Sequence, residues 1–329
     1  MLDSISPSLS IVVASYTPKR LPDLLALLES IRGQRHSDLE VVFVSDGDRE
    51  LASEIEARAP SLGISLRVVF NAGSRGLSEA RNVGLQDARA EIIAFLDDDV
   101  VLSPEWTGQV VAAFEDPGVV GVTGPAFPLW DDESLNWVPE EFYWLLSCTG
   151  WTGWEYPQEV RNAWGMDMAF RRQDLVSAGG FSSHLGLKGS GGPVAEDVEF
   201  ALRVRASTGG KILYLPKAQV WHRVHRYRLS FRYILQRSYQ VGRSRWFVKR
   251  LSDALGLTDS LAAERTLLSR MFNRTFPLVL RGLFRRPRTA VRQGLLAVSS
   301  LAAFTAGFVT GAILTWPRVA NHTTYPELP

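Results

Sequence analysis

Four short apolar runs, each ending in polar residues, most constrain the fold of this chain. The first run is followed by a segment with the helical spacing of leucine and isoleucine (Leu21–Ile31), and the third by a similar segment over 77–88. Strands that alternate with helices predict an α/β fold with a mostly parallel sheet covered by helices on both faces. The four runs are Leu9–Tyr16, Leu39–Gly47, Ser65–Asn71 and Glu91–Asp99.

The polar residues that end these runs are expected to meet at one edge of the sheet. In open parallel sheets, ligands bind outside the carboxyl ends of the strands. The side chains predicted there are those of Tyr16, Asp46, the turn Asn71–Gly76 and the acidic triplet Asp97–Asp99. The sequence therefore predicts a ligand site rich in carboxylates at this edge.

Composition excludes several classes of protein. With 329 residues, 46% apolar and 22% charged, the chain can bury a sizeable core and is not disordered. The formal net charge of +1 does not indicate a dedicated nucleic-acid binder. The single Cys148 excludes an intramolecular disulfide and a multi-cysteine metal site, and it is typical of a reducing compartment. No secretory signal is expected at the N-terminus.

The C-terminal third carries a membrane signal. The segment Gly294–Trp316 contains no charged side chain. Its length is that which a helix needs to cross a bilayer. Five arginines between Arg281 and Arg292 precede this segment and predict that its N-terminal side is cytoplasmic. We therefore expect a single-pass membrane protein whose preceding domain lies on the cytoplasmic side. A buried C-terminal helix is the alternative.

A basic and aromatic segment lies before that apolar stretch. From Arg223 to Arg250 there are nine Lys or Arg residues and no Asp or Glu. Such a segment near a membrane span is typical of an interfacial surface for anionic headgroups or a lipid phosphate. Single-stranded nucleic acid and a solvated basic face are alternatives. The nearby apolar segment favours lipid, so we expect a membrane partner and no nucleic acid.

The acidic triplet predicts a site for a divalent cation. In an extended segment, Asp97 and Asp99 point to the same side. Neighbouring carboxylate oxygens suit Mg²⁺ or Mn²⁺, which in turn neutralise a diphosphate. A charged turn exposed to solvent is the alternative interpretation.

Six stretches of the chain follow one another in a recognisable order. They are "IVVASY", "VSDG", "NAGSRGLSEARNVGL", "AFLDDDV", "WGMDMAFRRQDLVSAGGF" and "AEDVEFALRVRASTGGKILYLPKAQVWH". This ordered set resembles the family 2 glycosyltransferases, which are inverting enzymes of the GT-A, or nucleotide-diphosphosugar transferase, fold. The resemblance covers roughly residues 8–222. A looser resemblance to archaeal glucosyl-dolichyl-phosphate glucuronosyltransferases comes from "VPEEFYWLLSC", "VRNAWG", "RSYQVGRSR" and the apolar C-terminal end.

The resemblance implies a site for a UDP-sugar donor. Asp46 would accept from the imide N–H of uracil, and Tyr16 would flank the base. An arginine beside the diphosphate would offset its charge, although for Arg81 an ion pair with a neighbouring acid is a strong alternative. The residues expected to bind the donor are Tyr16, Asp46, Arg75, Arg81, Asp97 and Asp98.

The resemblance also implies a metal, a base and an acceptor pocket. Asp99 and His222 would bind Mn²⁺ or Mg²⁺, although a lone histidine is often structural. Asp197 would be the general base that takes the proton of the acceptor hydroxyl. Favourable charge at a helix N-terminus is the alternative for the pair Glu196–Asp197. The residues expected in the acceptor and sugar pocket are Trp164, Gly165, Asp167 and Glu196, with a structural turn aspartate as the alternative for Asp167.

Together these features predict a metal-dependent, inverting hexosyltransferase. It would move one sugar from a UDP-sugar, such as UDP-glucuronate or UDP-glucose, to a dolichyl- or polyprenyl-phosphate-linked saccharide. "GRSRW" lacks the glutamine of a Gln-x-x-Arg-Trp motif, which argues against a processive polymer synthase. A polyprenyl-phosphate monosaccharide synthase, a transferase of cell-surface polysaccharide synthesis and a non-enzymatic relative remain alternatives. The expected parts are a GT-A catalytic domain over 1–222, a basic membrane-proximal helical region over 223–293, a membrane helix over 294–316 and a tail over 317–329.

Overall fold

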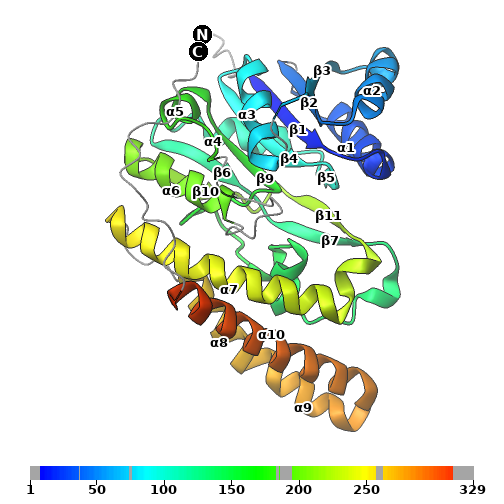
Figure 1. The fold of residues 1–329 in the computed structure, drawn as a ribbon, viewed down its shortest axis with the longest axis vertical. Helices are drawn as coiled ribbons and strands as arrows, with labels where there is room; N and C mark the ends of the chain where they lie inside the picture. The colour runs from blue at the N-terminus through cyan, green and yellow to red at the C-terminus, as the bar shows by residue number, and fades with distance from the viewer. Residues whose placement is uncertain are drawn as a thin grey trace. The chain divides into compact units, whose positions relative to one another are not determined.

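The structure is a computed structural model of the full chain, and Figure 1 shows its fold. It describes residues 8–36, 38–73, 76–182, 185, 195–256 and 262–313, so Arg75, part of the predicted membrane segment and the predicted tail lie outside the described residues. The chain divides into two compact units, which we call the catalytic unit and the C-terminal unit. Of the described residues, the catalytic unit contains those within 8–127 and 154–222, and the C-terminal unit contains those within 128–153 and 223–313. The predicted domain boundaries stay predictions.

The catalytic unit is built on an eight-stranded sheet with the order β3-β2-β1-β4-β9-β6-β10-β8. Strands β3, β2, β1 and β4 are parallel, whereas β9 is antiparallel to both β4 and β6. The strands are β1 (Leu9–Ser15), β2 (Leu39–Asp46), β3 (Ser65–Asn71), β4 (Ile92–Asp97), β6 (Val119–Thr123), β8 (Gln158–Val160), β9 (Asp167–Arg171) and β10 (Lys211–Tyr214).

A three-stranded sheet has the order β5-β11-β7, formed by β5 (Val100–Leu102), β11 (Val220–Val224) and β7 (Ala126–Trp130). Its β5–β11 pairing sets His222 opposite Val100, directly after the acidic triplet. The helices of the catalytic unit are η1 (Pro18–Arg20), α1 (Leu21–Arg32), α2 (Arg49–Leu62), α3 (Leu77–Asp87), α4 (Trp106–Ala113), α5 (Arg172–Ser177) and α6 (Glu196–Thr208).

The central strands are apolar along their whole length because helices cover both faces of the sheet. On β1, Ile11 and Val13 pack with residues of α1, α2 and α4, while Val12 between them packs with residues of α3, α5 and α6. Gly84 lets α3 approach β1 closely, since a Cβ at this position would lie 2.2 Å from a methyl carbon of Val12. The predicted α/β fold, a mostly parallel sheet between layers of helices, is confirmed.

The C-terminal unit is mainly helical and has its own core. That core joins Phe142, Leu146, Ile234, Met271 and Leu296 among others. Its helices are η2 (Glu133–Leu135), η3 (Glu140–Leu146), η4 (Gly150–Thr152), η5 (Arg226–Leu229), α7 (Phe231–Ala254), α8 (Ala262–Arg270), the π-helix η6 (Met271–Thr275), α9 (Phe276–Arg285) and α10 (Pro287–Ile313). Among the described residues, α10 is the one helix long and apolar enough to cross a membrane.

Candidate functional site

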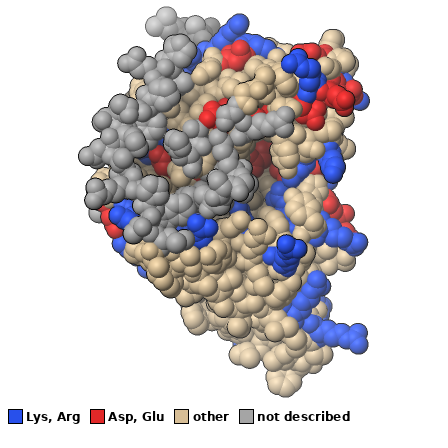
Figure 2. Space-filling model, in the orientation of Figure 1, with Lys and Arg blue, Asp and Glu red and all other residues tan. Residues whose placement is uncertain are grey.

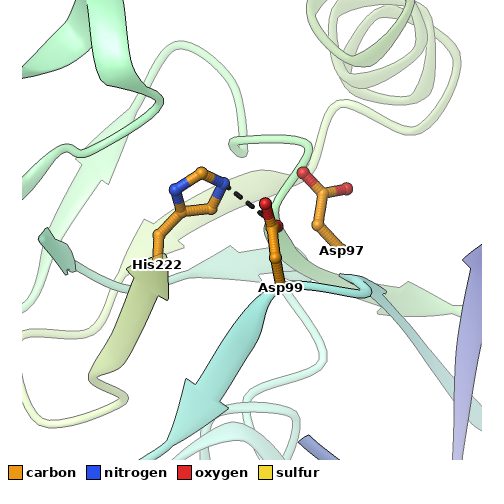
Figure 3. A group of neighbouring side chains, drawn as sticks. All are labelled: Asp97, Asp99 and His222. Atoms are coloured by element: carbon orange, nitrogen blue, oxygen red, sulfur yellow. Dashed lines mark ion pairs between the residues drawn. The ribbon is translucent and has the colours of Figure 1, made fainter. Parts of the chain in front are cut away.

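The acidic triplet lies at the end of a strand and in the turn that follows it. Strand β4 ends at Asp97, residues 98 and 99 form a turn, and β5 begins at Val100. The expectation that Asp97 and Asp99 share one face of an extended segment is therefore wrong, because the turn at residues 98 and 99 interrupts the extended backbone. The turn nevertheless brings both carboxylates toward His222 of β11 (Figure 3). The three residues each offer one ligand atom, and these atoms all lie within 4.8 Å of one another.

This group fits a divalent cation by its chemistry. Two carboxylates and an imidazole are ligands that Mn²⁺ accepts, and hard oxygen ligands also suit Mg²⁺. Asp99 and His222 are buried, with 3% and 1% of their surface exposed, and His222 Nε2 lies 3.2 Å from Asp99 Oδ1. Buried carboxylates are costly without a positive partner. The cluster therefore has the composition of a metal centre.

Arg20 supplies a positive charge on one side of the triplet. Its Nη1 donates to Asp99 and lies 3.6 Å from Asp98 Oδ1. Burial, and next the neighbouring Asp99 carboxylate, raise the pKa of Asp98 to about 7, although Ser15 and Arg20 act in the opposite direction. A carboxyl with such a pKa is only partly ionised near neutral pH, which reduces the repulsion within the triplet.

Arg81 supplies the positive charge on the other side. It projects from α3, is only 3% exposed, and its Nη2 donates to the backbone oxygen of Gly165 at 2.7 Å. The same nitrogen lies 3.3 Å from Asp97 Oδ1, and Nη1 lies 3.9 Å from Glu196 Oε1. These contacts correspond to the ion pair named as the alternative to a diphosphate contact. Arg81 thus links Asp97, a candidate metal ligand, to the segments that carry the predicted base.

Glu196 and Asp197 begin α6, as predicted for a helix N-terminus. Glu196 is 6% exposed, whereas Asp197 is partly exposed. Asp197 Oδ2 accepts from the backbone N–H of Gly165 at 3.0 Å, and Oδ1 accepts from the N–H of Val198 at 2.8 Å. Gly165 leaves room for this close arrangement, since a Cβ would lie 3.1 Å from Asp197 Oδ2 and 3.2 Å from Arg81 Nη2. These two bonds hold the side chain of Asp197 in one orientation.

Asp46 lies at the end of β2, next to the end of β3. Its Oδ1 accepts from Asn71 Nδ2 at 2.7 Å, and its Oδ2 accepts from the backbone N–H of Gly76 at 2.9 Å. Each carboxylate oxygen has a further lone pair, so these bonds leave Asp46 able to accept from a ligand. Tyr16 follows β1 and is 69% exposed, so its ring is open to a ligand at this edge.

Trp164 and Asp167 differ in their surroundings. Trp164 is partly exposed and stacks on Trp154, with ring centroids 6.4 Å apart. Asp167 is 2% exposed, and its two oxygens accept from Trp106 Nε1 at 2.9 Å and from the Gly124 N–H at 3.0 Å. Burial raises the pKa of Asp167 to about 7, although the two hydrogen bonds act to lower this pKa. Its geometry favours the structural role that the sequence left as the alternative.

Two residues of this region were missed by sequence reasoning. Arg20 follows the first strand in "SYTPKR", and its position at the ligand edge was the available signal. Trp106 lies in α4, and its indole reaches Asp167 across 61 residues of sequence, which no local pattern indicates. Arg75 lies outside the described residues. The site therefore gathers Asp97, Asp98, Asp99, His222, Arg20, Arg81, Gly165, Glu196 and Asp197.

Solved structures with a similar fold support the same architecture. A mannosyltransferase from Pyrobaculum calidifontis, solved with GDP-Man and Mn²⁺, matches with a TM-score of 0.61 at 19% identity, covering 93% of this chain and 88% of its own. GalNAc-T7, solved with UDP, GalNAc and Mn²⁺, matches with a TM-score of 0.54 at 15% identity, covering 83% of this chain and 58% of its own. At these identities the likeness shows the fold alone.

Relatives in sequence are also transferases or proteins of glycan synthesis. The glucosyl-dolichyl phosphate glucuronosyltransferase of Haloferax volcanii is 32% identical over 249 residues, which are 75% of this chain and 77% of the relative. The succinoglycan biosynthesis protein ExoM of Rhizobium meliloti is 26% identical over 239 residues, 72% of this chain and 73% of the relative. The family described as glycosyl transferase family 2 matches residues 10–175. This chain belongs to glycosyl transferase family 2 and is a transferase.

Proposed function

We propose that this enzyme transfers one sugar, with inversion, from a UDP-sugar to a saccharide linked to a dolichyl or polyprenyl phosphate. The observation that carries the proposal is the convergence of Asp97, Asp99 and His222 beside Asp197, which Gly165 and Arg81 connect to them. UDP-glucuronate and UDP-glucose are the donors we favour, because the Haloferax volcanii relative is named a glucuronosyltransferase.

Asp97, Asp99 and His222 are the residues that would hold a divalent cation. When bound, Mn²⁺ or Mg²⁺ supplies positive charge that stabilises the leaving diphosphate. Asp46 and Tyr16 would bind the uracil, and Asp98 would be a further residue that binds the donor. Arg20 is well placed to turn from Asp99 to the donor diphosphate once a cation compensates the carboxylate.

Asp197 would act as the general base. Its carboxylate is fixed by two backbone N–H groups and is partly exposed, so it can meet an acceptor hydroxyl. Asp197 would take that proton as the hydroxyl oxygen attacks the anomeric carbon on the face opposite the leaving diphosphate. The new C–O bond forms while the bond to the diphosphate breaks, and the configuration at the anomeric carbon is inverted. Trp164, Gly165 and Glu196 would form the wall beside the sugar. The ring of Trp164 offers an apolar face on which a pyranose can stack.

The acceptor proposal depends on the C-terminal unit and on the relative's name. The one candidate membrane helix is α10, and the relative acts on a glucosyl-dolichyl phosphate according to its name. A single crossing by 294–316, with the catalytic unit on the cytoplasmic side, is the prediction from sequence.

The proposal is tested in two steps with the purified full chain. Thermal stability is measured against a panel of UDP- and GDP-sugars with and without Mn²⁺, and we expect stabilisation by a UDP-sugar only with the metal. Product formation is then measured on glycolipid and on bare lipid phosphate. Transfer to bare lipid phosphate alone would instead indicate a monosaccharide synthase.

The base assignment has its own control. Asp197→Asn should retain the melting temperature and donor binding but lower turnover by about 10²-fold or more. The matched variant Asp174→Asn, in the first turn of α5, makes the same chemical change in the same unit and should retain full turnover. Turnover of Asp197→Asn equal to that of the control would remove Asp197 from the mechanism.

A further inference from the structure

The C-terminal unit exposes an apolar stripe along α10. The exposed fractions are 51% for Val291, 59% for Leu295, 65% for Val298, 49% for Val309 and 73% for Ile313. The steps between them are four, three, eleven and four residues, which are each close to a whole number of helical turns, so these side chains form one face. Helix α9 adds Leu278, Leu280, Leu283 and Phe284, and Phe284 is 93% exposed. Apolar surface of this extent indicates an interaction site.

Positive charge borders this apolar surface. Between Arg265 and Ile313 the chain has eight arginines and no acidic residue. Arg270 and Arg274 pair with acids of η3, and Arg292 stacks on Trp137 at 3.8 Å. In the same orientation as Figure 1, the end of the molecule formed by α9 shows basic and no acidic side chains (Figure 2). Four further arginines are exposed and form no ion pair among the described residues: Arg281, Arg285, Arg286 and Arg288.

The opposite face of α10 packs closely on α7 (Figure 1). Three glycines permit the contact. A Cβ on Gly242 would lie 2.0 Å from the Phe304 oxygen, one on Gly307 would lie 2.1 Å from the Tyr239 oxygen, and one on Gly311 would lie 3.0 Å from the Arg243 oxygen. The two backbones therefore touch over two turns of α10. Trp246 and Phe308 add an edge-to-face ring contact at 5.3 Å.

Helix α7 is too basic to enter the hydrocarbon core. It carries six Lys or Arg side chains within Phe231–Ala254. Basic side chains at the centre of a bilayer are strongly disfavoured. If α10 crossed the bilayer while it remained packed on α7, the middle of α7 would lie at the same depth. A crossing and the α7–α10 contact therefore exclude each other.

We propose that the C-terminal unit lies on an anionic lipid bilayer with α9 and α10 in the plane of the interface. The apolar stripe of α10 and the exposed side chains of α9 would enter the headgroup and acyl boundary of one leaflet. Arg281, Arg285, Arg286 and Arg288 would contact anionic headgroups, and α7 would stay on the aqueous side. This arrangement satisfies the apolar face, the arginines and the glycine contact together. It holds whether or not the enzyme uses a lipid-linked acceptor.

The decisive measurement is the depth of three positions along α10. Val291→Cys, Val298→Cys and Val309→Cys are made one at a time in the full chain carrying Cys148→Ser, because Cys148 is buried and its loss leaves a single label site. Each variant is labelled with a fluorophore and bound to vesicles of phosphatidylcholine and phosphatidylglycerol, and quenching is compared among lipids with quenchers at known depths. In-plane helices should give three equal depths.

A crossing helix gives a different result. Eighteen residues separate Val291 from Val309, which is a rise of about 27 Å along a helix axis. Depths that change from one interface to the other along α10 would overturn the proposal and restore the single-pass prediction. Equal shallow depths support it. The measurement reads no enzymatic activity, so its failure is distinct from a failure of the proposed function.

Vesicle flotation tests the surface itself. Leu280→Glu combined with Phe284→Glu should lower binding to anionic vesicles at least tenfold, whereas the matched change Val176→Glu, at an exposed position of α5, should leave it unchanged. The triple variant Arg281→Gln, Arg285→Gln and Arg286→Gln should lose roughly a hundredfold in binding to anionic vesicles and little to neutral ones. No binding to anionic vesicles, or a dimer in solution that the α9 substitutions dissociate, would overturn the proposal.

Discussion

Replacing Arg81 by methionine should destabilise the enzyme strongly, because Arg81 is buried and compensates the buried Glu196 and the partly buried Asp97. Removing one partner of a buried ion pair typically costs about 3–5 kcal/mol. Asp97 retains 30% side-chain exposure, and the contact to Glu196 is 3.9 Å, so we expect the lower end, about 3 kcal/mol. Methionine preserves the apolar stem of the side chain, so the loss reports the guanidinium rather than packing.

The matched control is Arg32→Met in the same unit. Arg32 pairs with Glu29 three residues earlier on α1, but the two side chains are 55% and 61% exposed. An exposed pair of this kind contributes little to stability, because solvent screens the two charges. Urea unfolding, followed by tryptophan fluorescence, gives both free energies of unfolding under identical conditions.

Two outcomes separate the roles that Arg81 can have. A loss below about 1 kcal/mol, close to that of Arg32→Met, would refute our reasoning that the guanidinium holds the acids together. If stability is unchanged while the KM for the nucleotide sugar rises, the diphosphate contact predicted from sequence is the main role. Because Gly165 joins Arg81 to Asp197, we expect kcat to fall together with stability.

Three further predictions concern the metal, the pH and the packing behind the site. Asp99→Asn and His222→Gln should each abolish the Mn²⁺ binding that titration calorimetry detects in the unsubstituted enzyme, and Mn²⁺ binding that persists in both would place the metal elsewhere. Burial raises the pKa of Asp167 to about 7, so the native state binds the proton of this carboxyl more tightly than the unfolded chain does. The resulting contribution to stability is complete below pH about 4 and is lost as the pH rises through about 7. Asp167→Asn should therefore reduce the change of the free energy of unfolding with pH between these values, as measured by urea unfolding. Gly124→Ala should lower the melting temperature sharply, since its Cβ would lie 1.7 Å from the Ala218 oxygen, whereas Gly108→Ala in α4 meets nothing within 4 Å and should stabilise by up to about 1 kcal/mol; equal melting temperatures would contradict the packing argument.

The sheet could be predicted because its signal is local. Parallel strands buried on both faces are continuously apolar, and polar residues begin where each strand reaches the ligand edge. The predicted runs Leu9–Tyr16, Leu39–Gly47 and Ser65–Asn71 agree with β1, β2 and β3 within one residue. The strands β6, β8, β9 and β10 were not assigned from sequence, and the antiparallel position of β9 between β4 and β6 depends on contacts distant in sequence.

The length and composition of the apolar C-terminal segment do not distinguish between two arrangements at a membrane. An apolar segment of this length satisfies a helix that crosses a bilayer and a helix that packs on one face and meets lipid on the other. Only the contact of Gly307 and Gly311 with α7 distinguishes the two, because it places a basic helix alongside. Spacing along α10 alone does not identify its neighbour.

By itself, the sequence determined the family, the strand edges and the residue types that meet there: carboxylates for a cation, a histidine beside them and an acid at a helix N-terminus. Tertiary structure decided the partners. It brings Asp97 and Asp99 close to His222. It pairs Arg20 with Asp98 and Asp99, and Arg81 with Asp97. It also buries Asp167, which accepts a hydrogen bond from the indole of Trp106. Residue types are encoded along the chain, whereas the charge that a buried carboxylate meets comes from strands and helices that are distant in sequence and adjacent only after folding.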